Sequence, residues 1–306
     1  MDHRPFRVGA LAVIGMLPLG GCATTAISSS IVTTTSMVET PAESADVPAE
    51  STTVDVDEPT SVPALVEEVT TTTVAPLDRP IVSVSALAEP IPAIGTNSGP
   101  DATRLQQRLL DLGYWVQATD GEYGLTTRQA VMAFQKYEGL TPTGSLDEAS
   151  AARISEVDTR PFGRAQAGTM VEVDKARQLL FVISEGETRW VLNASTGSEV
   201  PYSEPNSNNP DTIEEGDSVT PVGLHKVNRE REEGWWEGDL GQIYRPKYFR
   251  GGVAVHGANS VPEYPASHGC VRVSVPAMDW IWDEGLLPIG SLVWVHGDIP
   301  GATDGA

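Results

Sequence analysis

Apolar residues recur at helical spacing within residues 101–113. When this stretch is wound as a helix, four leucines share one face: Leu105, Leu109, Leu110 and Leu112. Capping-box spellings at Thr126–Gln129 and Ser145–Glu148 predict two further helix starts, because a hydroxyl residue precedes Gln or Glu by three positions. Glycine-containing turns separate the three segments. The pattern predicts a small module of three helices over residues 99–157.

The later part of the chain has a β-type pattern. Val253–Val255 is a short apolar run, which predicts a buried strand with His256 at its end. The Tyr, Trp and Gly content of this part fits a mainly-β sandwich with few helices. We therefore expect a multidomain chain, with a mainly-β domain over residues 168–297 and a tail over residues 298–306.

The first 21 residues have the pattern of an export signal. Arg4 and Arg7 precede an apolar run from Val8 to Leu19. As a helix this run would span only ~18 Å, which is too short for the ~30 Å hydrocarbon core of a bilayer. Leu19-Gly-Gly-Cys22 resembles the lipobox of bacterial lipoproteins, which implies lipid on Cys22 and a membrane tether outside the cytoplasm. An ordinary signal peptide with a chance cysteine, or an uncleaved anchor, is the alternative.

Residues 22–98 have the composition of a disordered linker. From Ala23 to Pro100 there is no aromatic residue, and eleven acidic residues face one base, Arg79. A coil of this length spans ~50 Å, enough to carry a domain away from a membrane. The whole chain has a formal net charge of −22. This charge argues against nucleic acid as a partner and against electrostatic adhesion to an anionic membrane or wall polymer.

The candidate chemistry centres on Cys270, which has no partner in the chain if Cys22 carries lipid. An unpaired thiol outside the cytoplasm is reactive, intermolecular, or simply a small buried apolar group. A catalytic thiol needs an imidazole to take its proton and N–H donors for the developing oxyanion. His256 and His268 lie close to Cys270 in sequence. A zinc site is a competing interpretation of these residues, because His and Cys are zinc ligands. Their spacing, however, matches no usual zinc-binding pair.

The segment Ser267-His268-Gly269-Cys270-Val-Arg272, preceded by His256-Gly257, resembles the signature of the L,D-transpeptidase catalytic domain, the YkuD family. The resemblance covers about 130 residues in order. The insert over residues 198–219 is a departure, because it is unusually long and acidic. Other segments that resemble the family are Met170–Asp174, Gln178–Ile183, Trp190–Gly197, Thr220–Gly223, a helix over Pro276–Asp283 after Ser274, and Gly290–Val295.

This resemblance implies a role for each residue of the signature. Cys270 is the expected nucleophile, and His256 is the expected base. His268 and the backbone N–H groups of Gly269 and Cys270 are expected to line the oxyanion site. Ser267 is expected to shape the turn. The resemblance implies no metal and no organic cofactor.

Several further residues are candidates with two interpretations each. Arg272 is expected to hold a carboxylate of the stem peptide or to brace the loop in an ion pair. Tyr248 is a candidate substrate-binding residue and Tyr244 a candidate oxyanion donor, with packing as the alternative for both. His225 and His296 are expected to be structural or surface histidines.

The helical module also resembles a known family. Leu105-Gln-x-x-Leu109, Asp120-Gly121 and Ala130-Val-x-x-Phe134-Gln are spelled as in the three-helix peptidoglycan-binding domain. The implied partners are the stem peptides and glycan of peptidoglycan, although such helices could also be a structural spacer.

The expected reaction is acyl transfer from a tetrapeptide stem to a neighbouring stem through a thioester on Cys270. The same chemistry with water as acceptor gives an L,D-carboxypeptidase, and with a protein as acceptor it attaches that protein to the wall. A catalytically silent wall-binding lipoprotein is the alternative from another class. The loops over residues 198–219 and 229–241 are expected to form the rim of the site and to select the acceptor.

Overall fold

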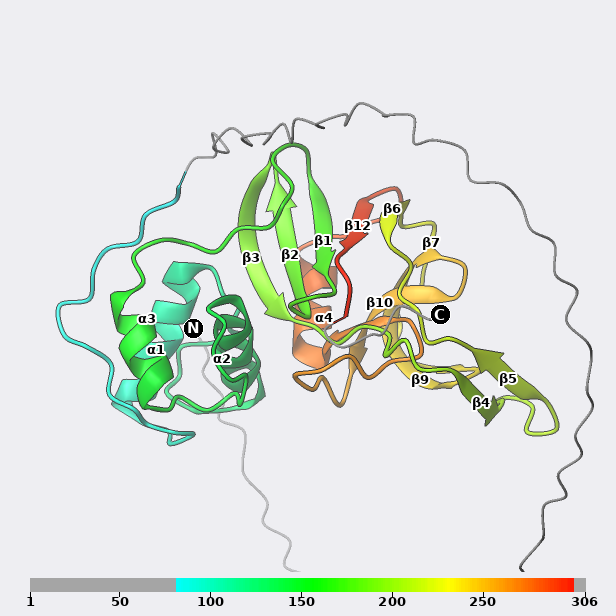
Figure 1. Ribbon diagram of the computed structural model, residues 1–306, viewed down its shortest axis with the longest axis horizontal. Coiled ribbons are helices and arrows are strands. Elements are labelled where there is room, and N and C mark those ends of the chain that lie inside the picture. The colour runs from blue at the N-terminus through cyan, green and yellow to red at the C-terminus, as the bar shows by residue number, and fades with distance from the viewer. Residues whose placement is uncertain (1–80, 300–306) are drawn as a thin grey trace, which may run out of the picture. The chain divides into compact units, whose positions relative to one another are not determined.

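The computed structural model describes residues 81–299 of the chain (Figure 1). The predicted signal segment, Cys22, the linker up to residue 80 and the tail from residue 300 lie outside the described residues. Within residues 81–299, no helix is both long enough and apolar enough to cross a membrane.

Three helices occupy the first part of the described chain: α1 (Pro100–Leu112), α2 (Leu125–Tyr137) and α3 (Glu148–Glu156). The α1 helix ends at Gly113, whose positive φ of 88° lets its N–H reach back to the carbonyls of Leu109 and Leu110. Most of the predicted leucine face is confirmed, because three of its four leucines are fully buried, whereas Leu110 is half-buried. These leucines pack against buried side chains of α2 and α3: Val131, Phe134 and Ile154.

The capping predictions are wrong in detail. The α2 helix begins after Gly124, with no side-chain cap. The α3 helix is capped by Asp147, whose carboxylate accepts from the Ser150 N–H at 2.8 Å, and not by Ser145. Each helix starts near its predicted position, but a neighbouring residue takes the N-cap place.

The linker boundary also needs correction, because the chain is already packed before residue 98. Ile91 is 2% exposed, and Gly95 pairs with Leu146 through two backbone hydrogen bonds. The buried guanidinium of Arg108 donates to the carbonyl oxygens of Ser85, Ile154 and Val157. Residues 81–98 are therefore an extended strap on the helices. Its apolar side chains Val84, Leu87, Ile91 and Ile94 join the helical core, so the prediction that this stretch has no apolar stripe is wrong.

The remainder of the described chain is built mainly of strands, in agreement with the predicted mainly-β domain. One five-stranded sheet has the order β3-β2-β1-β12-β6, antiparallel except for the parallel pair β1 and β12. Its strands are β1 (Met170–Asp174), β2 (Leu179–Ser184), β3 (Glu187–Asn193), β6 (Gly223–Lys226) and β12 (Leu292–His296).

A second sheet carries the signature residues. Its order is β11-β10-β9-β7, with β8 also paired to β9, and β10 and β11 run parallel. Its elements are β7 (Arg229–Glu230), β8 (Trp235–Gly238), β9 (Gly241–Arg250), β10 (Val253–Ala258) and β11 (Val271–Ser274), followed by the helix α4 (Val275–Asp283). The predicted insert folds as a separate hairpin of β4 (Tyr202–Pro205) and β5 (Ile213–Gly216).

One apolar core joins the two larger sheets and α4. Val173 and Leu180 come from the first sheet, Val255 and Val271 from the second, and Met278 from α4; all are fully buried. A second core joins the helices to the outer face of the first sheet, where Phe181 and Val191 pack with the α1 leucines. The helices therefore share a continuous core with β2 and β3.

Candidate active site

Two neighbouring parallel strands bring the signature residues together. In the register of β10 and β11, His256 lies beside Arg272, and Cys270 directly precedes β11. Because side chains alternate along a strand, Val255 and Val271 point into the core while His256 and Arg272 lie on the opposite face. The predicted strand is confirmed and is a central strand of its sheet, but it continues to Ala258, so His256 lies within the strand and not at its end.

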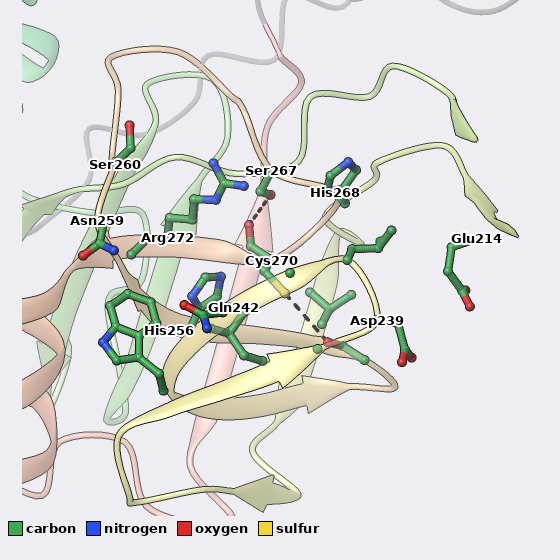
Figure 2. A pocket seen from close by; sticks show the side chains of 18 of the residues that line it. Glu214, Asp239, Gln242, His256, Asn259, Ser260, Ser267, His268, Cys270 and Arg272 are labelled. Carbon is green, nitrogen blue, oxygen red and sulfur yellow. Dashed lines mark hydrogen bonds between the residues drawn. The ribbon is translucent and has the colours of Figure 1, made fainter. Parts of the chain in front are cut away.

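A cleft of about 490 Å³ opens over this face (Figure 2). Its floor includes His256, Cys270 and Arg272, with Ser267 and His268 on one wall. The loops predicted to form the rim also line it, through Tyr202 and Glu214 of the hairpin and through Trp235 and residues 238–243 of β8 and β9. Sequence positions up to seventy residues apart therefore meet in one cavity.

The protonation state of His256 follows from its surroundings. The side chain is buried, and Nδ1 lies 2.8 Å from the carbonyl oxygen of Gly257. Because a carbonyl only accepts, Nδ1 carries the proton and Nε2 keeps its lone pair. Burial lowers the pKa of His256 to about 4, and the positive charge of Arg272 acts in the same direction. The imidazole is therefore neutral near pH 7 and can accept a proton at Nε2.

Cys270 is a free cysteine with a protonated thiol in its resting state. Burial raises the pKa of the thiol, and this effect is opposed by the Ala254 backbone and by the Arg272 guanidinium. Sγ donates to the carbonyl oxygen of Gly252 at 3.7 Å, the dashed contact of the sulfur in Figure 2. Thiol and imidazole are therefore both neutral, and attack by sulfur requires the proton to move as the new bond forms.

Hydrogen bonds within the turn hold Cys270 in place. The Ser267 hydroxyl donates to the Cys270 carbonyl at 2.5 Å and accepts from the Gly269 N–H at 3.1 Å. The expectation that Ser267 shapes the turn agrees with these contacts. Gly269 has a φ of 129°, and a Cβ there would lie 2.8 Å from the Val219 carbonyl oxygen. The expectation that the Gly269 N–H lines the oxyanion site differs from the structure, because this N–H already donates to the Ser267 hydroxyl within the turn.

A residue without a predicted role supports the same turn. The buried hydroxyl of Thr220 donates to the Gly269 carbonyl at 2.7 Å and accepts from the Gly197 N–H at 2.8 Å. Thr220 thus connects the segment that follows β3 to the turn of Cys270. The sequence signal for this role is the Thr220–Gly223 segment, which resembles the family.

The hairpin reaches His268. Nε2 of His268 lies 3.3 Å from a carboxylate oxygen of Glu204, and its ring packs against Tyr202 with centroids 4.7 Å apart. Both contacts come from β4. The insert therefore forms the wall of the cleft beside the nucleophile and contacts one of the predicted oxyanion residues directly.

Arg272 lines the cleft without an acidic partner. None of the ion pairs found within residues 81–299 includes it. The predicted bracing ion pair is therefore not found in the described chain. A half-buried guanidinium that faces a cavity is suited to an anionic ligand.

Tyr248 does not line the cleft, so its prediction as a substrate-binding residue is wrong. It is 7% exposed, and the Arg229 guanidinium covers its ring at 3.9 Å. Tyr244 donates its hydroxyl to Asp279 at 2.9 Å, which makes it a packing residue. Register shifts in the pairing of β9 with β10 decide which β9 side chains face the cavity, and they are not visible in the sequence.

The other histidines are structural, as expected. His225 contacts the Pro221 carbonyl at 3.0 Å, and His296 contacts the buried carboxylate of Glu172 at 2.7 Å. In residues 81–299 no group of three or more His, Cys, Asp or Glu side chains could hold a metal ion.

Comparison with known proteins identifies both parts of the chain. The model of the L,D-transpeptidase catalytic domain matches residues 168–295, and that of a peptidoglycan binding domain matches residues 98–154. The crystal structure of an L,D-transpeptidase from Xylanimonas cellulosilytica is 41% identical. The match covers 69% of this chain and 100% of that one, with a TM-score of 0.60. The chain belongs to the L,D-transpeptidase family.

Two other matches are more distant. An L,D-transpeptidase from Stackebrandtia nassauensis is 21% identical, and its match covers 70% of this chain and all of that one, with a TM-score of 0.39. The N-acetylmuramoyl-L-alanine amidase CwlM of Mycobacterium tuberculosis is 27% identical in an alignment 158 residues long, and the match covers 41% of this chain and 39% of CwlM. The chain thus spans about two fifths of that curated relative.

Proposed function

We propose that this L,D-transpeptidase forms peptidoglycan cross-links by acyl transfer through a thioester on Cys270. The observation that carries the proposal is the pairing of a free thiol with a neutral imidazole in one cleft. The imidazole carries its proton on Nδ1, which donates to the Gly257 carbonyl. This arrangement suits nucleophilic catalysis, because Nε2 is available as a base on the side where a substrate binds.

In the first step, Sγ attacks the carbonyl that joins the L-centre of the third stem residue to the terminal D-residue. The thiol proton passes to Nε2 of His256 and then to the departing amine as the C–N bond breaks. The D-amino acid leaves and a thioester remains. In the second step, an amine of a neighbouring stem attacks the thioester and gives its proton to His256, which returns it to sulfur. One amide replaces another, so no ATP is consumed.

The developing oxyanion needs donors other than Gly269. The Cys270 N–H is the predicted donor that remains. Nε2 of His268 faces the Glu204 carboxylate, which only accepts, so its proton is already directed there, and His268 forms the cleft wall next to Cys270. Arg272 binds a carboxylate of the donor stem, because its guanidinium faces the cavity with no ion-pair partner within the described residues. No metal or organic cofactor takes part in these steps.

The rest of the chain places this chemistry at the wall. The peptidoglycan-binding module holds the enzyme on glycan and stem peptides. Lipid on Cys22 tethers it to the outer face of the membrane, and the linker up to residue 80 provides the reach into the wall. Mass spectrometry of the mature N-terminus from the native host tests the lipid directly.

Two measurements on the purified chain test the proposed reaction. A carbapenem, whose strained β-lactam acylates nucleophiles, is expected to add once to the intact protein and not to Cys270→Ala. Disaccharide-tetrapeptide stems are expected to give cross-linked dimers and free D-amino acid. Trimmed tripeptide alone indicates an L,D-carboxypeptidase, and transfer only to a protein amine indicates protein attachment. Neither adduct nor turnover indicates a wall-binding lipoprotein without catalysis and overturns the proposal.

A further inference from the structure

A lysine from the helical module is buried against the catalytic domain. Lys136, in the last turn of α2, is 9% exposed. Its ammonium donates to the backbone carbonyls of Gln178 at 3.1 Å and Ala194 at 3.2 Å, and to the side-chain oxygen of Asn193. All three acceptors belong to the β domain, and together they use the three N–H donors of the ammonium.

The ammonium fixes the orientation of the Asn193 amide. An ammonium group cannot accept a hydrogen bond, so it must face the oxygen of Asn193. The Asn193 NH₂ group then points the other way and donates to Gln129 Oε1 at 2.7 Å and to the Val261 carbonyl at 3.2 Å. Gln129, also on α2, donates to the same Val261 carbonyl at 3.2 Å. Reversing the amide would break these contacts.

Val261 lies in the middle of the loop that connects the strand of His256 to the turn of Cys270. Asn259 and Ser260, directly before it, line the catalytic cleft. The far end of the loop is held separately, because the Ser195 hydroxyl donates to the Tyr264 carbonyl at 2.8 Å. The contacts from Asn193 and Gln129 therefore fix the part of the loop that forms the cleft wall.

We propose that Lys136 is a positioning residue for the active site, which holds the cleft-lining residues 258–260 through Asn193 and Val261. The peptidoglycan-binding module is then a structural part of the catalytic cleft as well as a grip on the wall. The kinetic part of this inference rests on the proposed function, whereas the structural part does not.

The choice of residue supports a positioning role. Burial lowers the pKa of Lys136 to about 7, and the negative charge of Glu263 opposes this shift, so the side chain is an ammonium below about pH 7. An apolar side chain of similar length would fill the same space without the cost of desolvating a cation. The ammonium has an effect that an apolar side chain lacks, because it selects the orientation of the Asn193 amide in which the oxygen faces Lys136.

Three variants of the full chain separate positioning from packing. Asn193→Asp keeps the size and the acceptor for Lys136 but loses both N–H donors. Lys136→Met keeps the apolar stem and loses the ammonium. Arg128→Met is the matched control, because it removes an exposed cation from the same helix. The measurements are hydrogen exchange of the loop amides, kcat and KM on tetrapeptide stems, alkylation of Cys270 by iodoacetamide, and sedimentation with insoluble peptidoglycan.

In Asn193→Asp and Lys136→Met, we expect exchange in residues 258–262 to accelerate and kcat/KM to fall, each by about tenfold, the equivalent of one lost hydrogen bond. The fall should lie mainly in KM, because His256 and Cys270 stay on paired strands. Alkylation and sedimentation should match the wild type, as should all measurements on Arg128→Met. A merely structural role would not produce this split between KM and kcat.

Unchanged exchange and unchanged kinetics in a folded Asn193→Asp overturn the proposal. The same effects in Arg128→Met also overturn it. Loss of folding in Asn193→Asp overturns it as well, because it would show that Asn193 stabilises the whole domain and not only the loop. If the wild type itself turns over no tetrapeptide, the proposed function fails. Hydrogen exchange then still decides whether Lys136 holds the loop.

Discussion

Nδ1 of His256 donates to the carbonyl oxygen of its neighbour Gly257 at 2.8 Å. The group that orients this imidazole is therefore a neutral backbone carbonyl and not a carboxylate. A carboxylate would stabilise the imidazolium and raise the pKa of the histidine. A carbonyl fixes the tautomer with a much weaker effect, so burial dominates and the pKa of His256 falls to about 4.

The first prediction concerns the pH dependence of acylation. His256 must be neutral to accept the thiol proton, so acylation is lost as pH falls through the pKa of about 4. At the basic end, burial raises the pKa of the Cys270 thiol, so the neutral pair persists beyond neutral pH. The second-order rate of carbapenem acylation should be flat from about pH 5 to pH 8. Stopped-flow absorbance of the β-lactam measures this rate.

A thiolate–imidazolium pair would hold a thiolate at neutral pH, because each charge stabilises the other and raises the pKa of the imidazole above its ordinary value of 6.5. Ultraviolet absorbance of a thiolate at neutral pH that is lost in Cys270→Ala would contradict the neutral pair. His256→Gln is the control, because it cannot accept the proton, and its residual rate should rise with pH as the thiol ionises.

The second prediction tests the support of the nucleophile turn. Thr220→Val keeps the shape of the side chain but leaves the Gly197 N–H and the Gly269 carbonyl without their partner. An unsatisfied buried polar group costs about 1–3 kcal/mol, so the free energy of unfolding should fall by this amount. Urea unfolding followed by tryptophan fluorescence measures it. In Thr220→Ser, which keeps the hydroxyl, the free energy of unfolding should fall clearly less. An equal fall in both variants would refute this role of the hydroxyl.

Much of this site could be predicted because its parts are close in sequence. The run of Val253–Val255 predicts the buried strand, and the spacing of His256 and Cys270 agrees with two adjacent parallel strands. In the same way, the leucine period predicts α1 because helical contacts are local. Local pattern is therefore enough for the helices and for the two central groups of the site.

The other parts depend on contacts between distant segments. The Gly269 carbonyl meets Thr220 from 49 residues away, and Lys136 meets Asn193 from 57 residues away. Nearness to His256 in sequence makes Tyr248 a candidate for the site, but the pairing of β7 with β9 places it under Arg229. The strap before residue 98 carries spaced apolar residues from Val84 to Ile94, but its composition resembles that of the acidic stretch before it, so composition alone does not separate the two.

The third prediction concerns Arg272 and the donor stem. Arg272→Met removes the charge that faces the cavity, so KM for the tetrapeptide should rise by about tenfold or more, the usual value of a charge-assisted hydrogen bond. A tetrapeptide whose terminal carboxylate is amidated should show a similar rise in KM with the wild type. With Arg272→Met its KM should rise little further. Steady-state kinetics with both donors measure this coupling. If Arg272→Met raises KM equally for the free and the amidated tetrapeptide, Arg272 does not recognise that carboxylate.

The last prediction concerns the hairpin of β4 and β5. Its tip is bonded to the β8–β9 turn, because the Ser207 N–H donates to the Asp239 carbonyl at 2.7 Å and the Asn208 amide donates to the Asp239 carboxylate at 3.0 Å. Two loops therefore meet beside the cleft, and both line it. We expect this contact to limit the access of water to the thioester, so that an amine acceptor competes successfully.

The base of the hairpin permits a clean deletion, because the Glu199 N–H already donates to the Ser218 carbonyl at 3.2 Å. Replacing residues 201–216 by two glycines should therefore leave the fold intact and raise the ratio of hydrolysis to transfer. Carbapenem acylation should slow but persist, because His268 loses its contacts with Tyr202 and Glu204. Chromatography of tripeptide and cross-linked products measures this ratio. Asn208→Ala, which breaks one bond of the contact, should shift it less in the same direction. An unchanged ratio in a deletion variant that still acylates would show that acceptor choice is decided elsewhere, on the floor of the cleft around Arg272.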